Sequence, residues 1–354
     1  MSDTDSLFPE TLPPARRRSR RPAAQRTTLA DVAHRAGVSL MTASRALSDP
    51  RQVSEKLRVK VEQAVAELAY VPNRAARALA SARSHAIAVL VPSFSNAVFT
   101  DVLAGIQDAL GPDGYQLLIG NTRYSSEEEE TLLRLHLQSH PAGILLTGLT
   151  QNDAVNKMLE VAGIPVVSMM DLSDDPRRAS VGLSQYDAGA AMVRHLLSRG
   201  YRRIGYLAAQ LDERTIKRTE GFRAALREAG LYDPRREVMV PDPSTVALGA
   251  ELIGRLLANA PDCDAVFCCN DDLAYGAIYQ CQRRGIAIPR DLAISGFNDL
   301  PTSAWMNPSL TTIATPRYRV GYEAAQLLKR LMAGEEPQTR NIDLGFSLIV
   351  REST

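Results

Sequence analysis

From Ala86 onward, short apolar runs typical of β-strands alternate with segments whose apolar residues recur at helical spacing. This alternation constrains the fold more than any other feature, because it predicts parallel sheets covered by helices. The predicted strands are AIAVLVP, YQLLIG, GILLTG, PVVSMM, RIGYLA, AVFCC and AISGF. The predicted helices are Val98–Leu110, Glu127–Gln138, Asn152–Val161, Asp187–Ser198, Thr219–Ala229, Ala247–Ala258 and Asp271–Arg284.

A segment rich in Asp and Pro, Asp171–Arg178, is predicted to divide this region into two similar α/β lobes. Two such lobes place the carboxyl ends of their strands along a shared cleft, which is where small ligands bind in open α/β sheets. Polar residues follow several of the strands, and each of them could instead be a helix cap or a turn residue. We expect Asp271 to cap its helix rather than to contact a ligand.

Residues 28–47, TLADVAHRAGVSLMTASRAL, predict two short helices joined by a glycine turn. Thr28 and Asp31 have the spacing of a capping box, and the first helix should end near Gly37. Ser39 can cap the second helix, in which Ala43, Ala46 and Leu47 face inward and Leu40, Met41, Thr42, Ser44 and Arg45 face outward. A helix–turn–helix has this form, with its second helix in the major groove of DNA. Ordinary helical bundles also contain such pairs, so the pattern alone leaves both interpretations open.

A third helix is predicted after Ser54, with apolar residues that close a small three-helix core: Leu57, Val61, Ala64, Val65 and Leu68. Pro72 should break this helix, and Asn73 can cap a short helix over residues 74–80. A helix of that length is not stable by itself in water. The polar residues 81–85 then mark a domain boundary.

The N-terminal residues 1–26 are rich in Ser, Pro and Arg, ending in ARRRSRRPAAQR, and we expect a disordered basic tail. The net charge of the chain is only +1, so the excess of arginine near the N-terminus is local. A nucleic-acid-binding patch requires no more than a local excess. The arginines could contact phosphates or simply form a solvated tail.

The sequence lacks the patterns of common enzyme classes. It contains no phosphate loop ending in GKS or GKT, no Gly-x-Ser-x-Gly motif and no histidines at metal-binding spacing, so we expect no catalysis, no cofactor and no metal. The four cysteines form no disulfide framework and are expected to be reduced thiols in the core. No apolar run could span a membrane, and no secretion signal is visible. We therefore expect a cytoplasmic protein; a transport-type binding protein would need an export signal and no DNA-binding head.

Several motifs resemble the Lac repressor/galactose repressor family of bacterial transcription regulators: TLADVAHRAGVS, YVPNRAARALA, NDDLAYGA and ISGFND. Within that family, LDERTIKRTEGF, FCCNDDLAYGA and CQRRG are most similar to the gluconate-utilisation repressors. The resemblance implies an α + α/β protein: a helix–turn–helix DNA-binding head at 27–72, a hinge helix and linker at 73–85, and an effector-binding and dimerisation core at 86–354. The core would resemble periplasmic sugar-binding proteins, with helix Tyr318–Met332 returning to the first lobe.

The resemblance also implies which residues contact DNA. The hinge helix would fold on operator DNA, pair with its twin from a second subunit and insert Leu79 into the minor groove. An unfolded linker with an incidental leucine is the alternative. The DNA-binding residues implied in this way are Thr28, Ser39, Leu40, Met41, Thr42, Ser44, Arg45, Asn73, Arg74 and Leu79.

For the effector, the resemblance implies contacts from Ser93, Phe99, Thr147, Asp171, Leu183, Arg218, Asn270, Asn298 and Arg317. Many family members have an acidic residue in place of Asn298 and an aromatic or neutral one in place of Arg317, so this pocket should be more positive. Arg218 and Arg317 could each offer a planar fork to a carboxylate. Without ligand we expect both arginines to be hydrated with the lobes apart. A competing view makes Arg317 a surface residue paired with Glu323 or another acid.

These observations predict a transcription regulator acting as a homodimer on a pseudo-palindromic operator in the cytoplasm of a bacterium, at the nucleoid. Repression released by a sugar acid such as gluconate or 6-phosphogluconate is the favoured mechanism. A neutral sugar or a phosphorylated sugar acid is an alternative effector, and a sugar-binding protein without a transcriptional role is the alternative class. We expect no membrane partner.

Overall fold

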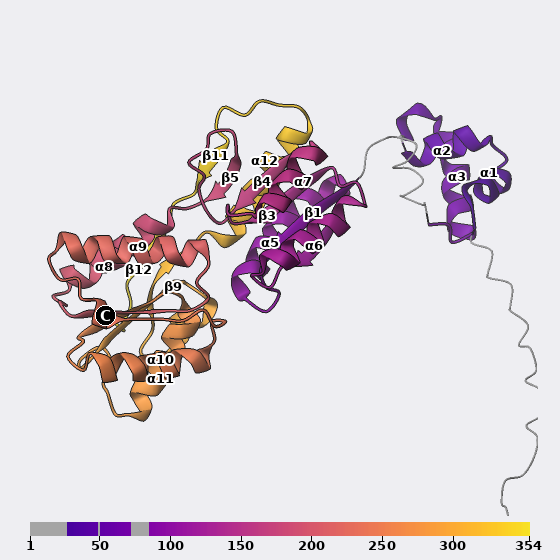
Figure 1. The fold of residues 1–354 in the computed structure, drawn as a ribbon. Coiled ribbons are helices and arrows are strands. Elements are labelled where there is room, and N and C mark those ends of the chain that lie inside the picture. The colour runs from indigo at the N-terminus through magenta and orange to yellow at the C-terminus, as the bar shows by residue number, and fades with distance from the viewer. Residues whose placement is uncertain (1–26, 49, 72–84) are drawn as a thin grey trace, which may run out of the picture. The chain divides into compact units, whose positions relative to one another are not determined.

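The computed structural model of the protein describes residues 27–48, 50–71 and 85–354 (Figure 1). These residues belong to two compact units, with the boundary between Ala80 and Ser81. The predicted basic tail and the hinge residues Asn73, Arg74 and Leu79 lie outside the described residues. What was predicted for them therefore remains a prediction.

The N-terminal unit contains three α-helices, α1 (Leu29–Ala36), α2 (Leu40–Ser48) and α3 (Glu55–Glu67), and a short 3-10 turn, η1 (Pro50–Gln52). Its small core is made by residues from all three helices: Val32, Ala33, Ala36, Ala43, Ala46, Val61 and Ala64. The inward residues predicted for the second and third helices are thus buried or half-buried. Ser54 stands at the N-cap position of α3, but its side chain makes no capping hydrogen bond, contrary to expectation.

The C-terminal unit contains two six-stranded sheets. The first has the order β11-β5-β4-β3-β1-β2 and is parallel throughout. Its strands are β1 (Ala86–Val91), β2 (Gln116–Asn121), β3 (Gly143–Thr147), β4 (Val166–Met169), β5 (Ala179–Gly182) and β11 (Asn341–Asp343). Together with its covering helices this sheet forms the first lobe.

The second sheet has the order β12-β10-β9-β8-β6-β7, and only β12 runs antiparallel to its neighbour. Its strands are β6 (Ile204–Ala208), β7 (Glu237–Met239), β8 (Ala265–Cys268), β9 (Ala293–Asn298), β10 (Thr311–Ala314) and β12 (Ser347–Ile349). The side chains between this sheet and its helices are fully buried aromatic and aliphatic groups, such as Tyr206, Phe222 and Phe267. This sheet and its helices form the second lobe.

Helices cover both sheets. The first lobe has α5 (Ala97–Leu110), α6 (Ser126–Leu137), α7 (Asp153–Ala162) and α12 (Arg317–Met332). The second has α8 (Gln185–Ser198), α9 (Glu213–Glu228), α10 (Val246–Asn259) and α11 (Asp271–Arg283). Short 3-10 turns lie at Gly111–Asp113 (η2), Pro234–Arg236 (η3) and Pro301–Trp305 (η4). The fold class predicted from the sequence is confirmed.

The chain crosses between the lobes after β5, after β10 and after β11. Helix α12 follows the second crossing and packs on α5 of the first lobe, as predicted. The two helix backbones approach so closely that a Cβ on Gly105 would overlap the carbonyl oxygen of Tyr318, and one on Gly321 would overlap that of Val102. Glycine is required at both positions by this contact.

Two predictions about the chain path were wrong. The segment Asp171–Arg178 does not end the first lobe, because β5 follows it and pairs with β4 in the first sheet. Helix α9 begins at Glu213, not at Thr219, because Asp212 caps it by accepting a hydrogen bond from the amide of Thr215 at 2.9 Å.

Candidate functional site

In the N-terminal unit, helix α2 presents the surface that was predicted to face DNA. The Ser39 hydroxyl accepts a hydrogen bond from the Thr42 amide at 3.1 Å, so Ser39 caps the helix as expected. Leu40 and Met41 are 55% and 63% exposed. Ser44 and Arg45 are exposed, and Thr42 is half-buried. A helix that exposes two large apolar side chains at its first turn is suited to contact with another surface.

Helix α1 holds α2 in place. Thr28 and Asp31 form the predicted capping box, in which the Thr28 amide donates to the Asp31 carboxylate at 2.7 Å and the Asp31 amide donates to the Thr28 hydroxyl at 3.3 Å. Gly37 ends the helix with a left-handed φ of 67°, which glycine adopts without strain. Arg35 of α1 pairs with Glu67 of α3 at 2.5 Å. The three helices therefore form one small supporting scaffold.

In the C-terminal unit, a cavity of about 250 Å³ lies between the two lobes, at the carboxyl ends of strands from both sheets. The first lobe contributes residues that follow β1, β2 and β4, among them Ser93, Asn96, Phe99, Tyr124 and Met170. The second lobe contributes residues that follow β6, β8 and β9 and residues of α9, among them Gln210, Asp212, Arg214, Arg218, Asn270 and Asn298. We call this cavity the interlobe pocket.

A second cavity of about 260 Å³ adjoins the interlobe pocket and shares three of its residues, Tyr124, Asp212 and Arg214. Thr147 and Glu129 also line it. Glu129 is 8% exposed, and burial raises the pKa of its carboxyl to about 7.

Five of the predicted effector residues line the interlobe pocket: Ser93, Phe99, Arg218, Asn270 and Asn298. Four do not. Thr147 lines the adjoining cavity and donates its hydroxyl to the Leu90 carbonyl at 3.1 Å. Leu183 is fully buried in the core. Asp171 and Arg317 are held by protein partners described below.

The prediction that Arg218 is hydrated in the absence of ligand is wrong, because its side chain is buried among protein groups. Its Nε and Nη2 donate to the side-chain oxygen of Gln185 at 3.3 and 2.8 Å, and Nη1 donates to the carbonyl of Cys269. The guanidinium also lies 3.6 Å from the ring centroid of Phe297. Burial lowers the pKa of Arg218, and none of its hydrogen-bond partners among the described residues is a carboxylate.

Arg317 is also not hydrated. Its side chain is 10% exposed, its Nε donates to the Asp101 carboxylate at 2.8 Å, and its other nitrogens donate to the carbonyls of Asn298 and Asp299. The competing expectation of an acidic partner is thus correct, although the partner is Asp101 and the arginine is not a surface residue. Arg317 joins the first lobe to the end of β9.

Arg214 is a pocket residue that the sequence analysis missed. Its guanidinium pairs with Asp212 and lies 5.5 Å from the ring centroid of Phe99. Burial would raise the pKa of Asp212, but the Arg214 charge and the Thr215 amide bring it below its ordinary value. The signal was available in the sequence: Asp212 followed by Thr215 marks a helix start, and that start places Arg214 in the first turn at the cleft.

Asp271 does not cap α11 as expected. Asn270 is the cap, and its side-chain oxygen accepts from the Leu273 amide at 3.0 Å. Asp271 is fully buried and accepts hydrogen bonds from the Leu300 amide at 2.7 Å, Ser303 at 2.9 Å and Thr312 at 2.7 Å. Burial raises its pKa to about 6. It therefore joins α11 to η4 and β10.

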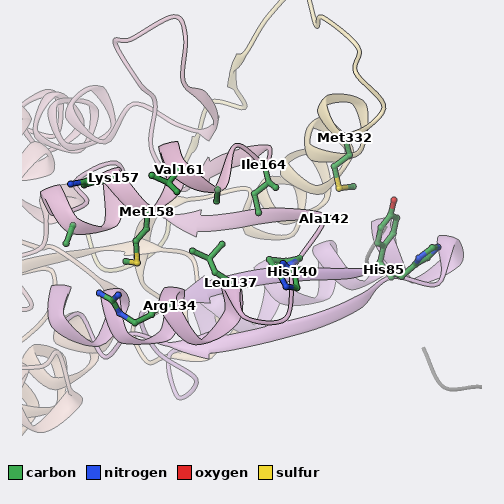
Figure 2. Close-up of a pocket in the computed structure, with 14 residues that line it drawn as sticks. His85, Arg134, Leu137, His140, Ala142, Lys157, Met158, Val161, Ile164 and Met332 are labelled. Carbon is green, nitrogen blue, oxygen red and sulfur yellow. The ribbon is translucent and has the colours of Figure 1, made fainter. Parts of the chain in front are cut away.

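A third and larger cavity, of about 940 Å³, lies in the first lobe alone (Figure 2). It opens at the amino ends of β1 to β4, where His85, Tyr115, Ala142 and Ile164 precede the strands. Apolar side chains of α6, α7 and α12 line it, with Arg134, His140 and Lys157 among them. We call this cavity the first-lobe hollow.

Three further observations on the described residues concern cysteines, metal-binding side chains and membrane-spanning helices. All four cysteines, Cys263, Cys268, Cys269 and Cys281, are buried and free. No cluster of metal-binding side chains occurs among the described residues. Within that same part of the chain, no helix has the length and apolarity needed to cross a membrane.

Comparison with known proteins agrees with this organisation. Residues 28–73 match the model for bacterial regulatory proteins of the lacI family, and residues 193–354 match a periplasmic binding protein-like domain. HTH-type transcriptional regulator GntR of Pseudomonas aeruginosa is 52% identical over 93% of this chain and 96% of its own length. GntR of Escherichia coli K12 is 42% identical over 92% of this chain and 97% of its own.

Solved structures give the same result. The transcription regulator GntR from Chromobacterium violaceum is 53% identical, with a TM-score of 0.74, and covers 76% of this chain and 98% of its own. The Lac repressor dimer bound to operator and an anti-inducer is 26% identical, with a TM-score of 0.83, over 93% of this chain and 99% of its own.

The fold, the exposed helix α2 and these similarities define a DNA-binding transcription regulator, not an enzyme. The chain belongs to the lacI family of bacterial regulatory proteins, as its sequence motifs indicated. Its relatives at 52% and 42% identity are both regulators named GntR.

Proposed function

We propose that this protein is a cytoplasmic repressor that binds a pseudo-palindromic operator as a homodimer and releases it when a sugar acid enters the interlobe pocket. The observation that carries the proposal is the buried guanidinium of Arg218, which lines the pocket without a carboxylate partner among its hydrogen bonds. Burying an unpaired charge is costly, and an anionic ligand would offset that cost. Gluconate is the first candidate, because relatives named GntR share most of the chain.

The rest of the pocket suits a small polyol with one acidic group. Its volume of about 250 Å³ is near the lower end of the range for small-molecule sites, which is roughly 300–1,000 Å³. Hydroxyl and amide groups of Ser93, Asn96, Ser244 and Asn270 can hydrogen-bond to hydroxyls. Asp272 also lines the pocket, and burial raises the pKa of its carboxyl.

Backbone strain supports a functional role for the same cavity. Four of its non-glycine residues have positive φ angles: Tyr124 at 59°, Met170 at 74°, Gln210 at 53° and Asn298 at 116°. Such conformations cost about 1–3 kcal/mol each and cluster at ligand sites, where the surrounding structure holds them. They come from both lobes, so the strain is concentrated at the cleft.

Release of DNA requires that the effector bind the weakly DNA-binding state more tightly than the strongly binding one. We infer that ligand contacts with both lobes change how the lobes are arranged relative to each other. This rearrangement would then alter the arrangement of the two DNA-binding heads of the dimer. A dimer is needed because one small head reads few base pairs, whereas two heads on adjoining half-sites multiply specificity.

Calorimetry on the full-length protein tests the effector class. Gluconate, 6-phosphogluconate, glucose and D-glucitol are titrated separately; glucitol matches gluconate except that a hydroxymethyl group replaces the carboxylate. We expect gluconate to bind at least tenfold more tightly than glucitol. Equal affinities would exclude an anionic effector, and preference for the 6-phosphate would assign the pocket to phosphorylated acids.

The DNA-binding role is tested by operator selection with Arg45→Ala and Met41→Ala, because both side chains are exposed on α2. A bidentate arginine contact to a base contributes about 1–3 kcal/mol of discrimination. We expect altered base preference in both variants, with unchanged effector binding. Lys56→Ala on α3 is the control, since this residue is exposed outside the recognition helix.

A further inference from the structure

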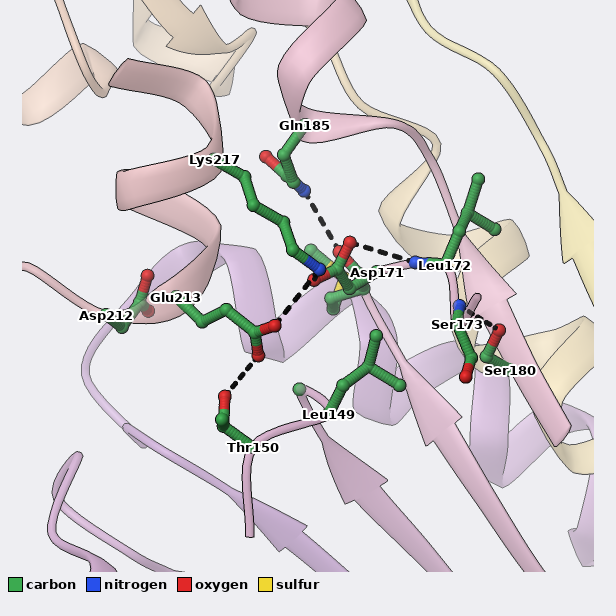
Figure 3. A network of polar contacts seen from close by, with 12 residues as sticks. Leu149, Thr150, Asp171, Leu172, Ser173, Ser180, Gln185, Asp212, Glu213 and Lys217 are labelled. Carbon is green, nitrogen blue, oxygen red and sulfur yellow. Dashed lines mark hydrogen bonds and ion pairs between the residues drawn. The ribbon is translucent and has the colours of Figure 1, made fainter. Parts of the chain in front are cut away.

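A chain of polar contacts joins the two lobes at the edge of the cleft (Figure 3). The Lys217 ammonium of α9 donates to the Asp171 carboxylate at 2.6 Å and lies 3.1 Å from the Glu213 carboxylate. Glu213 in turn accepts a hydrogen bond from the hydroxyl of Thr150. Asp171 and Thr150 belong to the first lobe, whereas Lys217 and Glu213 belong to the second. The chain of contacts therefore crosses between the lobes twice.

Both oxygens of Asp171 are occupied by these contacts. One accepts from the Leu172 amide at 2.9 Å and the other from Lys217, and the Asp171 side chain is 3% exposed. Burial raises the pKa of Asp171, while the Lys217 hydrogen bond opposes that rise. Asp171 is also absent from the residues that line the interlobe pocket. Its carboxylate is thus committed to Lys217 and not to a ligand.

The same place in the chain carries a second contact between the lobes. Gln185 at the start of α8 donates to the carbonyl of Met170 at 2.9 Å, and its side-chain oxygen accepts from Arg218. Met170 directly precedes Asp171, so a movement of this segment away from α9 would also break the hydrogen bond between Met170 and Gln185, the side chain that accepts from the Arg218 guanidinium. Lys217 and Arg218 are adjacent on α9, which couples the two contacts.

We propose that Lys217 is a positioning residue that latches Asp171 across the cleft, and that this latch sets the lobe arrangement in which Arg218 can receive an anionic effector. The statement about the effector rests on the proposed function; the latch itself does not. Asp171, which the family resemblance would place against the ligand, instead acts as the first-lobe half of the latch. Pairing with Lys217 also reduces the repulsion that a free carboxylate at the cleft would exert on an acid.

The latch is tested first without any ligand, by hydrogen exchange with mass spectrometry on the full-length chain. Lys217→Gln should speed amide exchange at least fivefold in peptides covering residues 170–173 of the first lobe and residues 213–218 of the second. Lys157→Gln is the matched control, because Lys157 is exposed and makes no hydrogen bond or ion pair with the described residues. Thr150→Val interrupts the same chain of contacts at its other end and should speed exchange in the same two segments to a smaller extent.

The charge pairing is tested by the double variant Asp171→Asn with Lys217→Gln. Two amides can still hydrogen-bond and leave no buried charge, so we expect exchange within about twofold of the wild type. Exchange as fast as in Lys217→Gln alone would overturn the latch, as would unchanged exchange in the single variant. Circular dichroism checks that all variants are folded, which we expect because the Lys217 side chain is 30% exposed.

The effector arm uses gluconate and D-glucitol in calorimetry with the same proteins. Lys217→Gln should weaken gluconate binding at least tenfold and glucitol binding less, and the double variant should recover most of the loss. Normal gluconate binding by Lys217→Gln overturns the positioning role, even if exchange changes. If the wild type binds neither compound while exchange responds as expected, the proposed function fails and the latch stands.

Discussion

The interlobe pocket and the first-lobe hollow differ in size, position and lining. The hollow is nearly four times larger, about 940 against 250 Å³, but it is formed by one lobe at the amino ends of its strands. The pocket is small, yet polar groups of both lobes converge on it at the carboxyl ends of the strands. Several of these groups are buried and have fixed partners, whereas the cationic groups around the hollow are exposed. We therefore base the proposed effector site on the convergence of constrained polar groups and not on cavity volume.

The largest effect that would sharpen this contrast is expected from Arg218→Ala. Removing one partner of a buried charge pair typically costs about 2–5 kcal/mol, so we expect gluconate affinity to fall by roughly 2–4 kcal/mol in calorimetry. Operator binding should persist, and effector-induced release should be lost in a mobility-shift assay. Arg218→Lys, which keeps the charge without the planar fork, is the companion variant and should lose less. Unchanged gluconate affinity in the alanine variant would remove this arginine from the site.

The second-largest effect is expected at Glu129, whose buried carboxyl lines the cavity that adjoins the interlobe pocket. Glu129 has a pKa raised to about 7 from an ordinary value of 4.5, so the folded protein holds a proton that the unfolded chain has lost between these pH values. Its contribution to the free energy of unfolding therefore falls as pH rises from about 4.5 to 7 and is constant above that. At 1.36 kcal/mol per pKa unit, the difference across this window is roughly 3 kcal/mol.

Glu129→Gln should remove that pH dependence. In urea unfolding followed by circular dichroism, we expect the variant and the wild type to be similar near pH 5 and the variant to be more stable at pH 8. Glu130→Gln is the control, since Glu130 forms an i,i+4 pair with an exposed Arg134 on the same helix. A stability difference that is the same at both pH values would contradict this assignment.

A smaller effect is expected from Arg214→Gln, which removes a charge from the wall shared by the interlobe pocket and the adjoining cavity. Hydrogen bonds to charged groups contribute about 1.5–3 kcal/mol when a partner is removed, and Asp212 already occupies part of this guanidinium. We therefore expect gluconate affinity to fall about tenfold and glucitol affinity to fall less. Equal losses for both compounds would mean that Arg214 shapes the wall of the interlobe pocket but does not recognise the carboxylate of gluconate.

The smallest effect is expected at the hollow. Lys157→Ala and Met158→Ala should leave gluconate affinity within about twofold of the wild type, because both residues belong to α7 and line the hollow, not the interlobe pocket. A tenfold loss in either variant would break the contrast between the two cavities.

The fold and part of the pocket could be predicted from the sequence, because long apolar strands and amphipathic helices carry local patterns. Strands of three or four residues, such as β7, β11 and β12, carry no such pattern and are defined by their neighbours in the sheet. The strand-end residues Ser93, Asn270 and Asn298 line the interlobe pocket because parallel strands bring their carboxyl ends together, and their contact with an effector stays a prediction.

The partners of Asp171 and Arg317 could not be predicted in the same way. Lys217 is 46 residues from Asp171, and Asp101 is 216 residues from Arg317, so their pairing depends on the packing of the lobes. Family resemblance suggested ligand contacts for both residues, and the contacts of the structure are with protein. A charged residue at a cleft can be identified from sequence, but whether it is free or already paired is a property of the tertiary structure.

The close contact of α12 with α5 has a consequence for the order of events during synthesis. The glycines that allow this contact lie at residues 105 and 321, so the helix that completes the first lobe is translated after almost the whole second lobe. Until α12 and β11 leave the ribosome, the nascent first lobe exposes the apolar side of α5 and an edge of β5. The first lobe therefore begins first but cannot be completed until nearly all of the second lobe has been made. A ribosome stalled before residue 317 would carry an incomplete domain, which is a natural substrate for chaperones.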